Sequence, residues 1–199
     1  MFVVYGDVES GNCYKVKLML ELLGREHRWN TIDITKGESR TPEFLARNPN
    51  GRVPLLEIEP GVFLPESNAI LCYLADGTEF LPTDRLLRAQ VMQWLFFEQY
   101  SHEPFIATSR YWLHFLKDPV GYKDKLAEKR PGGVNALNLM EAHLRHRPYF
   151  VGDRYTIADI ALYAYTHVAG EGGFSLDDHP AIRAWIARVA SHPRHCPMR

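Results

Sequence analysis

A change of hydrophobic period near the N-terminus constrains the fold most strongly. Residues 2–5 form a short apolar run typical of a strand, and residues 6–12 are polar and contain glycine, as in a loop. From residue 13 the apolar side chains share one helical face, namely Val16, Met19, Leu20 and Leu23, while Lys15, Lys17 and Glu21 fall elsewhere. Gly24 then ends the helix, and residues 29–34 return to a strand pattern. The order strand, helix, strand favours two parallel strands joined by a right-handed crossover.

A hairpin and another helix follow this unit. Residues 42–46 indicate a short helical piece that starts with proline. Residues 53–58 are typical of a strand, residues 59–61 of a tight turn, and residues 62–64 of the returning strand. Residues 67–74 are apolar at helical spacing.

The remainder of the chain indicates helices only. We therefore expect an α/β domain over residues 1–75, a linker over 76–84 and an all-helical domain over 85–199. The helical stretches are 86–101, 102–117, 131–146, 156–168 and 180–191, with a partly helical, charged segment over 118–130. Pro104 is expected to kink or break the second of them.

The composition excludes several classes of protein. The 199 residues include 46% hydrophobic and 24% charged side chains, and the net charge is −1 with no block of like charge. This balance predicts a globular protein without a nucleic-acid or membrane partner, and no apolar run is long enough for a membrane span. The three widely spaced cysteines and the absence of a secretory signal favour a reducing, cytoplasmic location, and no Cys/His grouping has the spacing of a metal site.

The first chemical motif is Ser10-Gly11-Asn12-Cys13, between a strand and a helix. Its spacing is that of a C-x-x-C redox motif with serine in the first position. A helix N-terminus favours an anion and therefore a thiolate over a thiol. The alternative is that Ser10 or Asn12 only caps the helix.

The second motif is the turn over residues 48–54, which leads into a strand. The Val53-Pro54 bond is a candidate cis peptide, and such a bond would leave the Val53 N–H and C=O groups outside the sheet, where they can pair with a bound peptide. The alternative is an ordinary proline at a sheet edge.

The third motif is Pro65-Glu66-Ser67-Asn68-Ala69-Ile70, at the start of a helix. The Ser67 hydroxyl and the helix N-terminus suit a carboxylate, and Glu66 suits a neighbouring ammonium group, so the pair can bind a zwitterion. The alternative is a plain helix cap.

Together and in this order, the three motifs resemble the cytosolic glutathione transferases, in particular the bacterial, theta-like and nu-like classes. The resemblance covers nearly the whole chain. In the second half, residues 152–159 resemble the family's buried helix-capping motif, in which Thr156 and Asp159 form a capping box and Tyr155 with Ile160 a hydrophobic staple. That role is structural, so these residues are not assigned to the site.

The resemblance implies a thioredoxin-like N-terminal domain, an all-helical C-terminal domain and glutathione as co-substrate, with no metal. Val53, beside Pro54, should pair with the cysteinyl backbone of glutathione, and Glu66 with Ser67 should hold its γ-glutamyl end. Arg52, or a residue of 36–40 such as Arg40, is expected at the glycyl carboxylate.

The thiol end of glutathione should lie at residues 10–13. Ser10 and Asn12 are the expected activating residues, by similarity to the theta-like classes and to the T-x-N-x-x-K-V motif of the disulfide-reductase-like group. Tyr5 is an alternative activator. Cys13 is either a packed, inert side chain or a thiol that forms mixed disulfides.

The resemblance also places a second substrate between the domains, against the long helix, with Tyr111, Trp112 and His114 as lining residues; Tyr100, His102 and Phe115 are further candidates. The expected activity is conjugation of glutathione to small hydrophobic electrophiles, as in detoxification, by a homodimer. Two alternatives remain open: a glutathione-dependent disulfide or peroxide reductase, and a non-catalytic binding module on the same scaffold.

Overall fold

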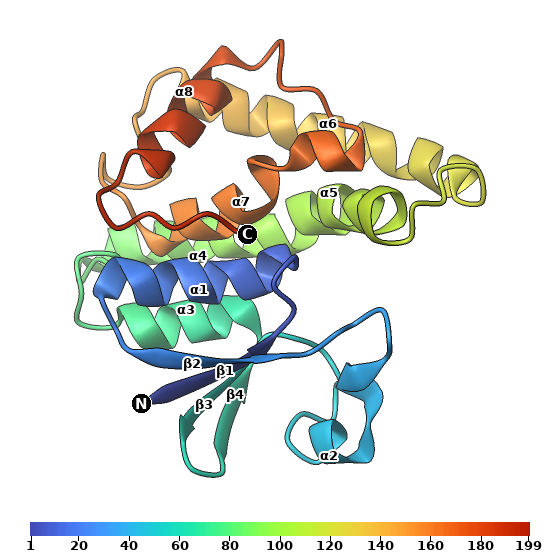
Figure 1. The fold of residues 1–199 in the computed structure, drawn as a ribbon. Helices are drawn as coiled ribbons and strands as arrows, with labels where there is room; N and C mark the ends of the chain where they lie inside the picture. The colour runs from blue at the N-terminus through green and yellow to red at the C-terminus, as the bar shows by residue number, and fades with distance from the viewer. The chain divides into compact units, whose positions relative to one another are not determined.

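The computed structural model describes all 199 residues, and the chain divides into two compact units (Figure 1). The first unit comprises Met1–Asp76 together with Pro193–Arg199, and the second comprises Gly77–His192. No helix is both long enough and apolar enough to cross a membrane.

The first unit is built on a four-stranded sheet with strand order β2-β1-β3-β4. The strands are β1 (Phe2–Gly6), β2 (His27–Thr31), β3 (Leu55–Glu59) and β4 (Val62–Pro65). β1 pairs parallel with β2 and antiparallel with β3, and β3 pairs antiparallel with β4. The predicted βαβ unit followed by a hairpin is therefore confirmed.

Helices α1 (Gly11–Leu23) and α3 (Ser67–Ala75) lie side by side and pack against each other (Figure 1). α1 ends where the sequence predicts: Gly24 adopts the left-handed conformation with φ of 61°, and its N–H bonds the carbonyl groups of the last turn. Between β2 and β3 lie a 3₁₀ turn, η1 (Glu38–Arg40), and the short helix α2 (Pro42–Leu45).

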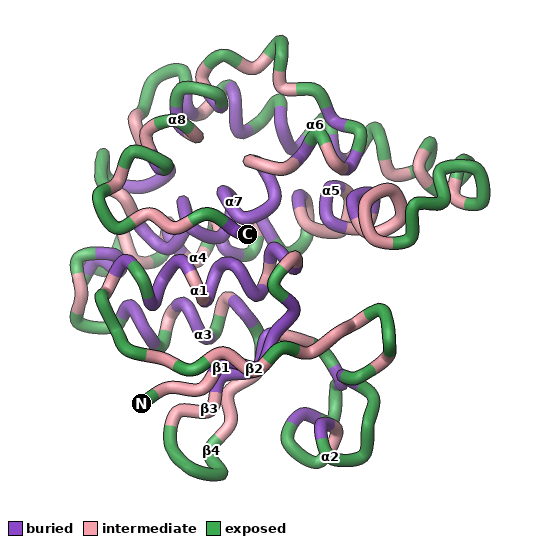
Figure 2. Tube along the Cα trace, viewed as in Figure 1, coloured by how far each residue is buried: buried purple, intermediate pink, exposed green.

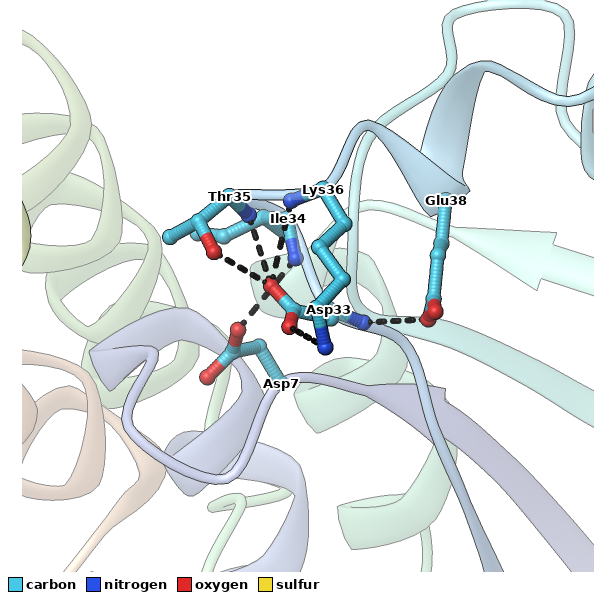
Figure 3. Close-up of polar contacts among 6 residues, drawn as sticks. All are labelled: Asp7, Asp33, Ile34, Thr35, Lys36 and Glu38. Carbon is cyan, nitrogen blue, oxygen red and sulfur yellow. Dashed lines mark hydrogen bonds and ion pairs between the residues drawn. The ribbon is translucent and has the colours of Figure 1, made fainter.

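Strands β2 and β3 differ slightly from the expected bounds. β2 ends at Thr31 rather than at residue 34, because the Asp33 side chain accepts hydrogen bonds from the next backbone N–H groups and turns the chain out of the sheet (Figure 3). β3 begins at Leu55 rather than at residue 53, since Pro54 has no N–H to give to the ladder.

The C-terminal tail was expected in the helical domain, but residues 193–199 belong to the first unit. The hydroxyl of Tyr14 donates to the Cys196 carbonyl at 2.7 Å, and Lys17 Nζ donates to the Pro197 carbonyl at 2.9 Å. These bonds hold the non-helical tail against α1.

The second unit is all helical, as predicted. Its elements are α4 (Arg85–Phe97), the π-helical turn η2 (Glu98–His102), α5 (Glu103–Arg110), the π-helical turn η3 (Tyr111–Phe115), α6 (Lys123–Leu144), α7 (Ile157–Thr166), the 3₁₀ turn η4 (Ala169–Gly172) and α8 (Pro180–Ala190). Pro104 lies in the first turn of α5, two residues after the end of η2. The wider π turn accommodates the missing proline N–H, so the chain changes helix type at this point.

Helix α6 is longer than expected and runs through Pro131. Proline inside a helix frees the carbonyl group four residues earlier, here that of Ala127. Ala127 is exposed, so its carbonyl can bond water and the helix continues. The following glycines allow close packing, because a Cβ atom on Gly133 would lie 2.3 Å from the Phe174 ring.

Helix α7 is the core of the second unit, and all of its residues are buried (Figure 2). Thr156 and Asp159 form the predicted capping box: Thr156 Oγ1 accepts from the Ala158 N–H, and the Asp159 carboxylate accepts from the Thr156 N–H at 2.9 Å. This motif is structural, as expected.

Candidate functional site

Ser10 forms the N-cap of α1 at the end of the loop after β1. It is buried, its Oγ accepts from the Cys13 N–H at 3.4 Å, and its φ and ψ are extended. The capping interpretation is thus confirmed. A hydroxyl has one hydrogen and two lone pairs, so a cap that uses a lone pair leaves the hydrogen for another acceptor.

Cys13 is fully buried behind this cap. A Cβ atom on Gly6 would lie 2.9 Å from Cys13 Sγ and 3.0 Å from the Trp29 ring, so the thiol is tightly packed. Burial raises the pKa of the Cys13 thiol to about 12, although the hydrogen bond with Ser10 lowers it. The structure thus gives Cys13 the packed, inert role rather than that of a reactive thiol.

The start of α3 has an unusual backbone. Glu66 adopts φ of 72° and ψ of 109°, and its side chain makes no cap bond. A non-glycine residue in this region costs of the order of 1–3 kcal/mol and is found preferentially at ligand sites. The following Ser67 is buried. The plain-cap alternative therefore does not describe Glu66, whose exposed carboxylate is directed by a strained backbone.

A hydrogen-bond network joins the starts of α1 and α3. Ser67 Oγ bonds Asn12 Oδ1 at 3.2 Å, and Lys15 Nζ bonds Ser67 Oγ at 3.4 Å and Asn68 Oδ1 at 3.2 Å. Lys15 has no exposed surface. The network brings two of the sequence-predicted motifs, those at residues 10–13 and 65–70, into direct contact.

The third motif lies before β3. The Val53-Pro54 bond is cis, as predicted. The register of β3 with β1 starts at Leu55, so Val53 lies outside the ladder. Buried Asn48 shapes the preceding turn, since its Nδ2 donates to the Arg52 carbonyl at 2.8 Å.

Arg40 and Arg52 lie at the same turn. Arg40 Nη1 donates to the Asn50 carbonyl at 3.0 Å, and the Arg40 guanidinium lies against Gly51, which adopts a φ of 60°. Arg52 is exposed. Both cations thus flank the backbone that leads to Val53.

The loop after β2 is held by its own polar contacts (Figure 3). The Asp33 carboxylate accepts from the Thr35 hydroxyl at 2.6 Å and pairs with Lys36 Nζ at 3.0 Å, and these contacts hold the pKa of Asp33 below its usual range. Asp7 Oδ2 accepts from the Ile34 N–H at 3.4 Å, which ties this loop to the one before α1. Lys36 is thereby engaged within its own loop and is a weaker candidate for a ligand carboxylate than Arg40.

Tyr5, the alternative activator, faces a different partner. Its hydroxyl donates to Glu57 Oε2 at 2.8 Å, and the ring packs in a cluster with Phe44 and Leu55. Burial, together with the bond to Glu57, raises the pKa of the Tyr5 hydroxyl. A hydroxyl that already donates to a carboxylate is poorly suited to donate to a sulfur.

This arrangement of motifs has close counterparts among known proteins. A family model for the N-terminal domain of glutathione S-transferases matches residues 9–76, and the model for their C-terminal domain matches residues 91–193. The chain belongs to the glutathione S-transferase family.

Three similar proteins show which members of the family this glutathione S-transferase resembles. It is 55% identical to a glutathione S-transferase from Pseudomonas fluorescens Pf-5, with a TM-score of 0.97 over 99% of this chain and 98% of that one. It is 29% identical over 189 residues to the disulfide-bond oxidoreductase YfcG of Escherichia coli K12, covering 92% of this chain and 87% of YfcG. A further glutathione transferase family member from Pseudomonas fluorescens Pf-5, solved with two glutathione bound, has a TM-score of 0.84 at 27% identity over 97% of this chain and 89% of that one.

The expected fold class, a thioredoxin-like domain followed by an all-helical one, is therefore confirmed for this glutathione S-transferase. No group of three His, Cys, Asp or Glu side chains is placed to hold a metal ion.

The residues predicted for the second substrate lie on η3, in the second unit. Trp112 stacks on Tyr122 with ring centroids 5.0 Å apart, and His114 Nδ1 lies 3.6 Å from Glu171 Oε2. Tyr111 packs near Phe115, at 5.6 Å between ring centroids. All three predicted residues are partly exposed.

The other candidates His102 and Tyr100 fit a role in binding the second substrate less well than the three residues of η3. His102 is fully buried and its Nε2 bonds Thr166 Oγ1 at 2.9 Å, so it belongs to the core of the unit. Tyr100 is 79% exposed on the surface of η2.

The T-x-N-x-x-K-V resemblance includes Lys15, but the sequence assigns it no role in the site. Position 15 lies outside the apolar face of α1, so the sequence pattern predicts that Lys15 faces solvent. The available signal was its place three residues after Asn12, which puts both side chains on one side of a helix.

Proposed function

We propose that this glutathione S-transferase binds glutathione on its first unit and activates the thiol for transfer to small hydrophobic electrophiles. The observation that carries the proposal is the network of Asn12, Ser67 and Lys15, which connects the two helix starts where the motifs predict the thiol and γ-glutamyl ends.

The γ-glutamyl end of glutathione is a zwitterion. Its carboxylate suits the N-terminus of α3, where the Ser67 and Asn68 backbone N–H groups and the nearby Lys15 charge favour an anion. Its ammonium group suits the exposed Glu66 carboxylate, as an ion pair with hydrogen bonds.

The middle and the glycyl end follow along β3. The Val53 backbone, beside Pro54 and outside the ladder, is available to pair with the cysteinyl N–H and C=O groups. Arg40 and Arg52 flank this backbone, and we assign one or both to the glycyl carboxylate.

Ser10 and Asn12 are the proposed activating residues. The Ser10 hydroxyl can donate to the sulfur of glutathione in place of its contact with Cys13, and the Asn12 amide is a second side chain of the donor type. Each unit by which such donors lower the thiol pKa corresponds to about 1.4 kcal/mol. The thiol proton leaves to solvent, the sulfur bonds to the electrophilic carbon, and the leaving group departs with its electron pair.

The second substrate is assigned to the aromatic surface of η3, through Tyr111, Trp112 and His114. Their partly exposed rings offer apolar area, and the His114–Glu171 contact offers a polar anchor. This assignment is tested by truncating each ring in turn and comparing KM for the electrophile with KM for glutathione.

Replacement of Ser10 by alanine tests the transferase proposal. With an aryl halide as electrophile, kcat should fall by at least about tenfold, as for loss of one donor to a developing anion, while glutathione still binds. Ser39→Ala is the matched control, because Ser39 is also a buried serine of the first unit. Unchanged turnover in Ser10→Ala would reject Ser10 as the activator.

A second candidate function is glutathione-dependent disulfide or peroxide reduction. The similarity to YfcG, a disulfide-bond oxidoreductase, favours it together with the Ser10-x-Asn12 spacing. In this reaction the glutathione thiolate attacks a disulfide sulfur and displaces a thiolate, and a second glutathione completes the exchange to glutathione disulfide. High turnover of hydroxyethyl disulfide with little turnover of aryl halides would assign the protein to this class.

A non-catalytic binding module is the third possibility; it would turn over neither an aryl halide nor a disulfide, and failure to bind glutathione in calorimetry would favour it further. We further propose a cytoplasmic homodimer, as for the family. The exposed apolar side chains Leu86, Phe96 and Tyr100, at helical spacing along α4 and η2, are consistent with a covered face. Light scattering should give twice the chain mass of 22.9 kDa.

A further inference from the structure

A buried asparagine holds the turn that leads into Val53. Asn48 is 3% exposed, and a buried amide needs hydrogen-bond partners within the protein. Its Oδ1 accepts from the Asn50 N–H at 3.2 Å, and its Nδ2 donates to the Arg52 carbonyl at 2.8 Å. The Asn48 backbone carbonyl also accepts from the Gly51 N–H at 2.9 Å. One residue therefore bonds the backbone of each of the residues 50–52.

The two side-chain partners of Asn48 are of opposite type, and this fixes the orientation of the amide. If the amide were turned over, its oxygen would face the Arg52 carbonyl oxygen and its NH₂ group would face the Asn50 N–H. Both contacts would leave buried polar groups without partners, which is costly. The donor Nδ2 is therefore held at the Arg52 carbonyl.

This carbonyl belongs to the peptide group that also carries the Val53 N–H. The peptide bond between Arg52 and Val53 is trans. In a planar trans peptide group the C=O and N–H bonds point in opposite directions. Because the Arg52 carbonyl is bonded to Asn48, the Val53 N–H is directed away from Asn48.

The Val53 N–H makes no hydrogen bond within the chain, since it lies outside the β3 ladder and no turn bond uses it. The Val53 side chain packs against the buried cluster of Tyr5, Phe44 and Leu55, which fixes the other side of the residue. Asn48 is anchored to the same cluster, because its N–H donates to the Phe44 carbonyl at 2.9 Å. The Val53 N–H is thus held in one direction and left for a ligand.

We propose that Asn48 is a positioning residue which, through the Arg52 carbonyl, directs the Val53 N–H to the cysteinyl carbonyl of glutathione. A hydrogen bond accepted by the carbonyl also polarises the peptide group and makes its N–H a stronger donor. The inference rests on the proposed function, since it concerns the backbone pairing of bound glutathione. It does not depend on which residue activates the thiol or on the reaction that follows.

Asn48→Asp tests this directly, because aspartate keeps the volume and the acceptor for the Asn50 N–H but places an oxygen at the Arg52 carbonyl. Two ligands are compared by calorimetry. The first is glutathione, and the second is an analogue in which an alkene replaces the amide between the cysteinyl and glycyl residues. The alkene keeps the geometry of the amide and lacks the carbonyl that would accept from Val53. The wild type should bind glutathione about five- to tenfold more tightly than the analogue, as for one hydrogen bond.

In Asn48→Asp this preference should fall to within about twofold, because an N–H that is no longer directed at the ligand cannot distinguish the two. KM for glutathione should rise by about five- to tenfold, while kcat at saturating glutathione should stay within about twofold. Asn50→Ala is the matched control, because Asn50 is an exposed asparagine of the same turn that contacts Asn48 and Arg40 through its backbone. It should keep the wild-type preference.

The outcomes separate this inference from the proposed function. An Asn48→Asp protein that binds both ligands more weakly by the same factor overturns the positioning role, because Asn48 then serves only the stability of the turn. If Asn48→Asp does not fold, Asn48→Ala decides the same question, since it removes the donor without adding a charge. A wild-type protein that fails to bind glutathione, or binds it no better than the alkene analogue, overturns the proposed function and with it this inference.

Discussion

The buried carboxylate of Asp159 should be the most sensitive single position for the stability of the second unit. Its oxygens accept four hydrogen bonds: from the Phe150 N–H at 3.1 Å, the Thr156 N–H at 2.9 Å, the Thr156 hydroxyl at 3.1 Å and Trp185 Nε1 at 2.9 Å. Burial raises its pKa to about 6 against these donors, so the group is ionised at neutral pH. It thereby ties α7 to the segment before it and to α8.

The expected cost of Asp159→Ala follows from the donors it leaves behind. Phe150 and Trp185 are 2% and 0% exposed, so neither N–H can turn to water. A buried donor without an acceptor costs about 1–3 kcal/mol, so the three N–H donors of Phe150, Trp185 and Thr156 together cost about 3–9 kcal/mol. Total stabilities are about 5–15 kcal/mol, so the variant should be close to unfolding at physiological temperature. Asp159→Asn retains one oxygen and should lose about 1–3 kcal/mol.

Urea unfolding followed by tryptophan fluorescence measures these losses. Asp177→Ala is the control, because Asp177 is an exposed aspartate whose side chain accepts a hydrogen bond from the nearby Ser175 hydroxyl. A loss of less than about 1 kcal/mol in Asp159→Ala, the level of an ordinary surface substitution, would show that these hydrogen bonds do not stabilise the second unit as predicted.

Three further predictions concern other positions. Cys13→Ala should keep turnover of an aryl halide and of a disulfide within about twofold, since a buried thiol with a pKa of about 12 forms no thiolate at neutral pH; a selective loss of disulfide turnover would restore its redox role. Glu141 is buried, which raises its pKa, but the N–H groups of Ile182 and Ala181 and the Arg145 side chain outweigh this and lower the pKa below 4.5. Glu141→Gln should therefore destabilise the protein near neutral pH, and its difference from the wild type in urea unfolding should disappear as the pH falls below 4.5; a constant difference would contradict this. Gly133→Ala should lose about 1–3 kcal/mol by overpacking against Phe174, whereas Gly170→Ala, where a Cβ atom meets nothing within 4 Å, should be close to neutral in thermal unfolding; equal effects would be evidence against the packing argument.

The elements with a clear local signal could be predicted from the sequence. The apolar period and Gly24 define α1, and the apolar strands with the turn at residues 59–61 define the hairpin. The end of β2 was misjudged because Ile32 and Ile34 continue a strand pattern. The Asp33 side chain bonds the backbone N–H groups that follow it and so marks the turn. An aspartate at this position was therefore the feature of the sequence that could have predicted the end of β2.

Helix α1 shows most clearly what the local sequence pattern cannot predict. A single apolar face predicts one buried side, but α1 is covered on more than one side: by β1, where Gly6 lies against Cys13, by α3 and by the C-terminal tail. Lys15 is buried as a result, and no periodicity shows this. The tail itself has no helical or strand pattern, so its place in the first unit follows only from long-range bonds to Tyr14 and Lys17.

The motifs of the candidate site were found from spacing, while their connection needed the structure. The spacing located Ser10, Asn12, Val53 and Ser67 but gave no order of contact among them. The bond between Asn12 and Ser67 is made across 55 positions of sequence, which only the packing of α1 on α3 brings together.

The most direct test of the account is a pH titration of the glutathione thiol in complex with the wild-type protein. Thiolate absorbance is followed at saturating glutathione and compared with glutathione alone, whose thiol is expected near the usual cysteine pKa of about 8.5. We predict that the bound thiol ionises at least about one unit lower, because Ser10 and Asn12 are proposed to donate to the sulfur and one pKa unit corresponds to about 1.4 kcal/mol. A bound thiol that titrates like the free one would contradict thiol activation and leave a binding module.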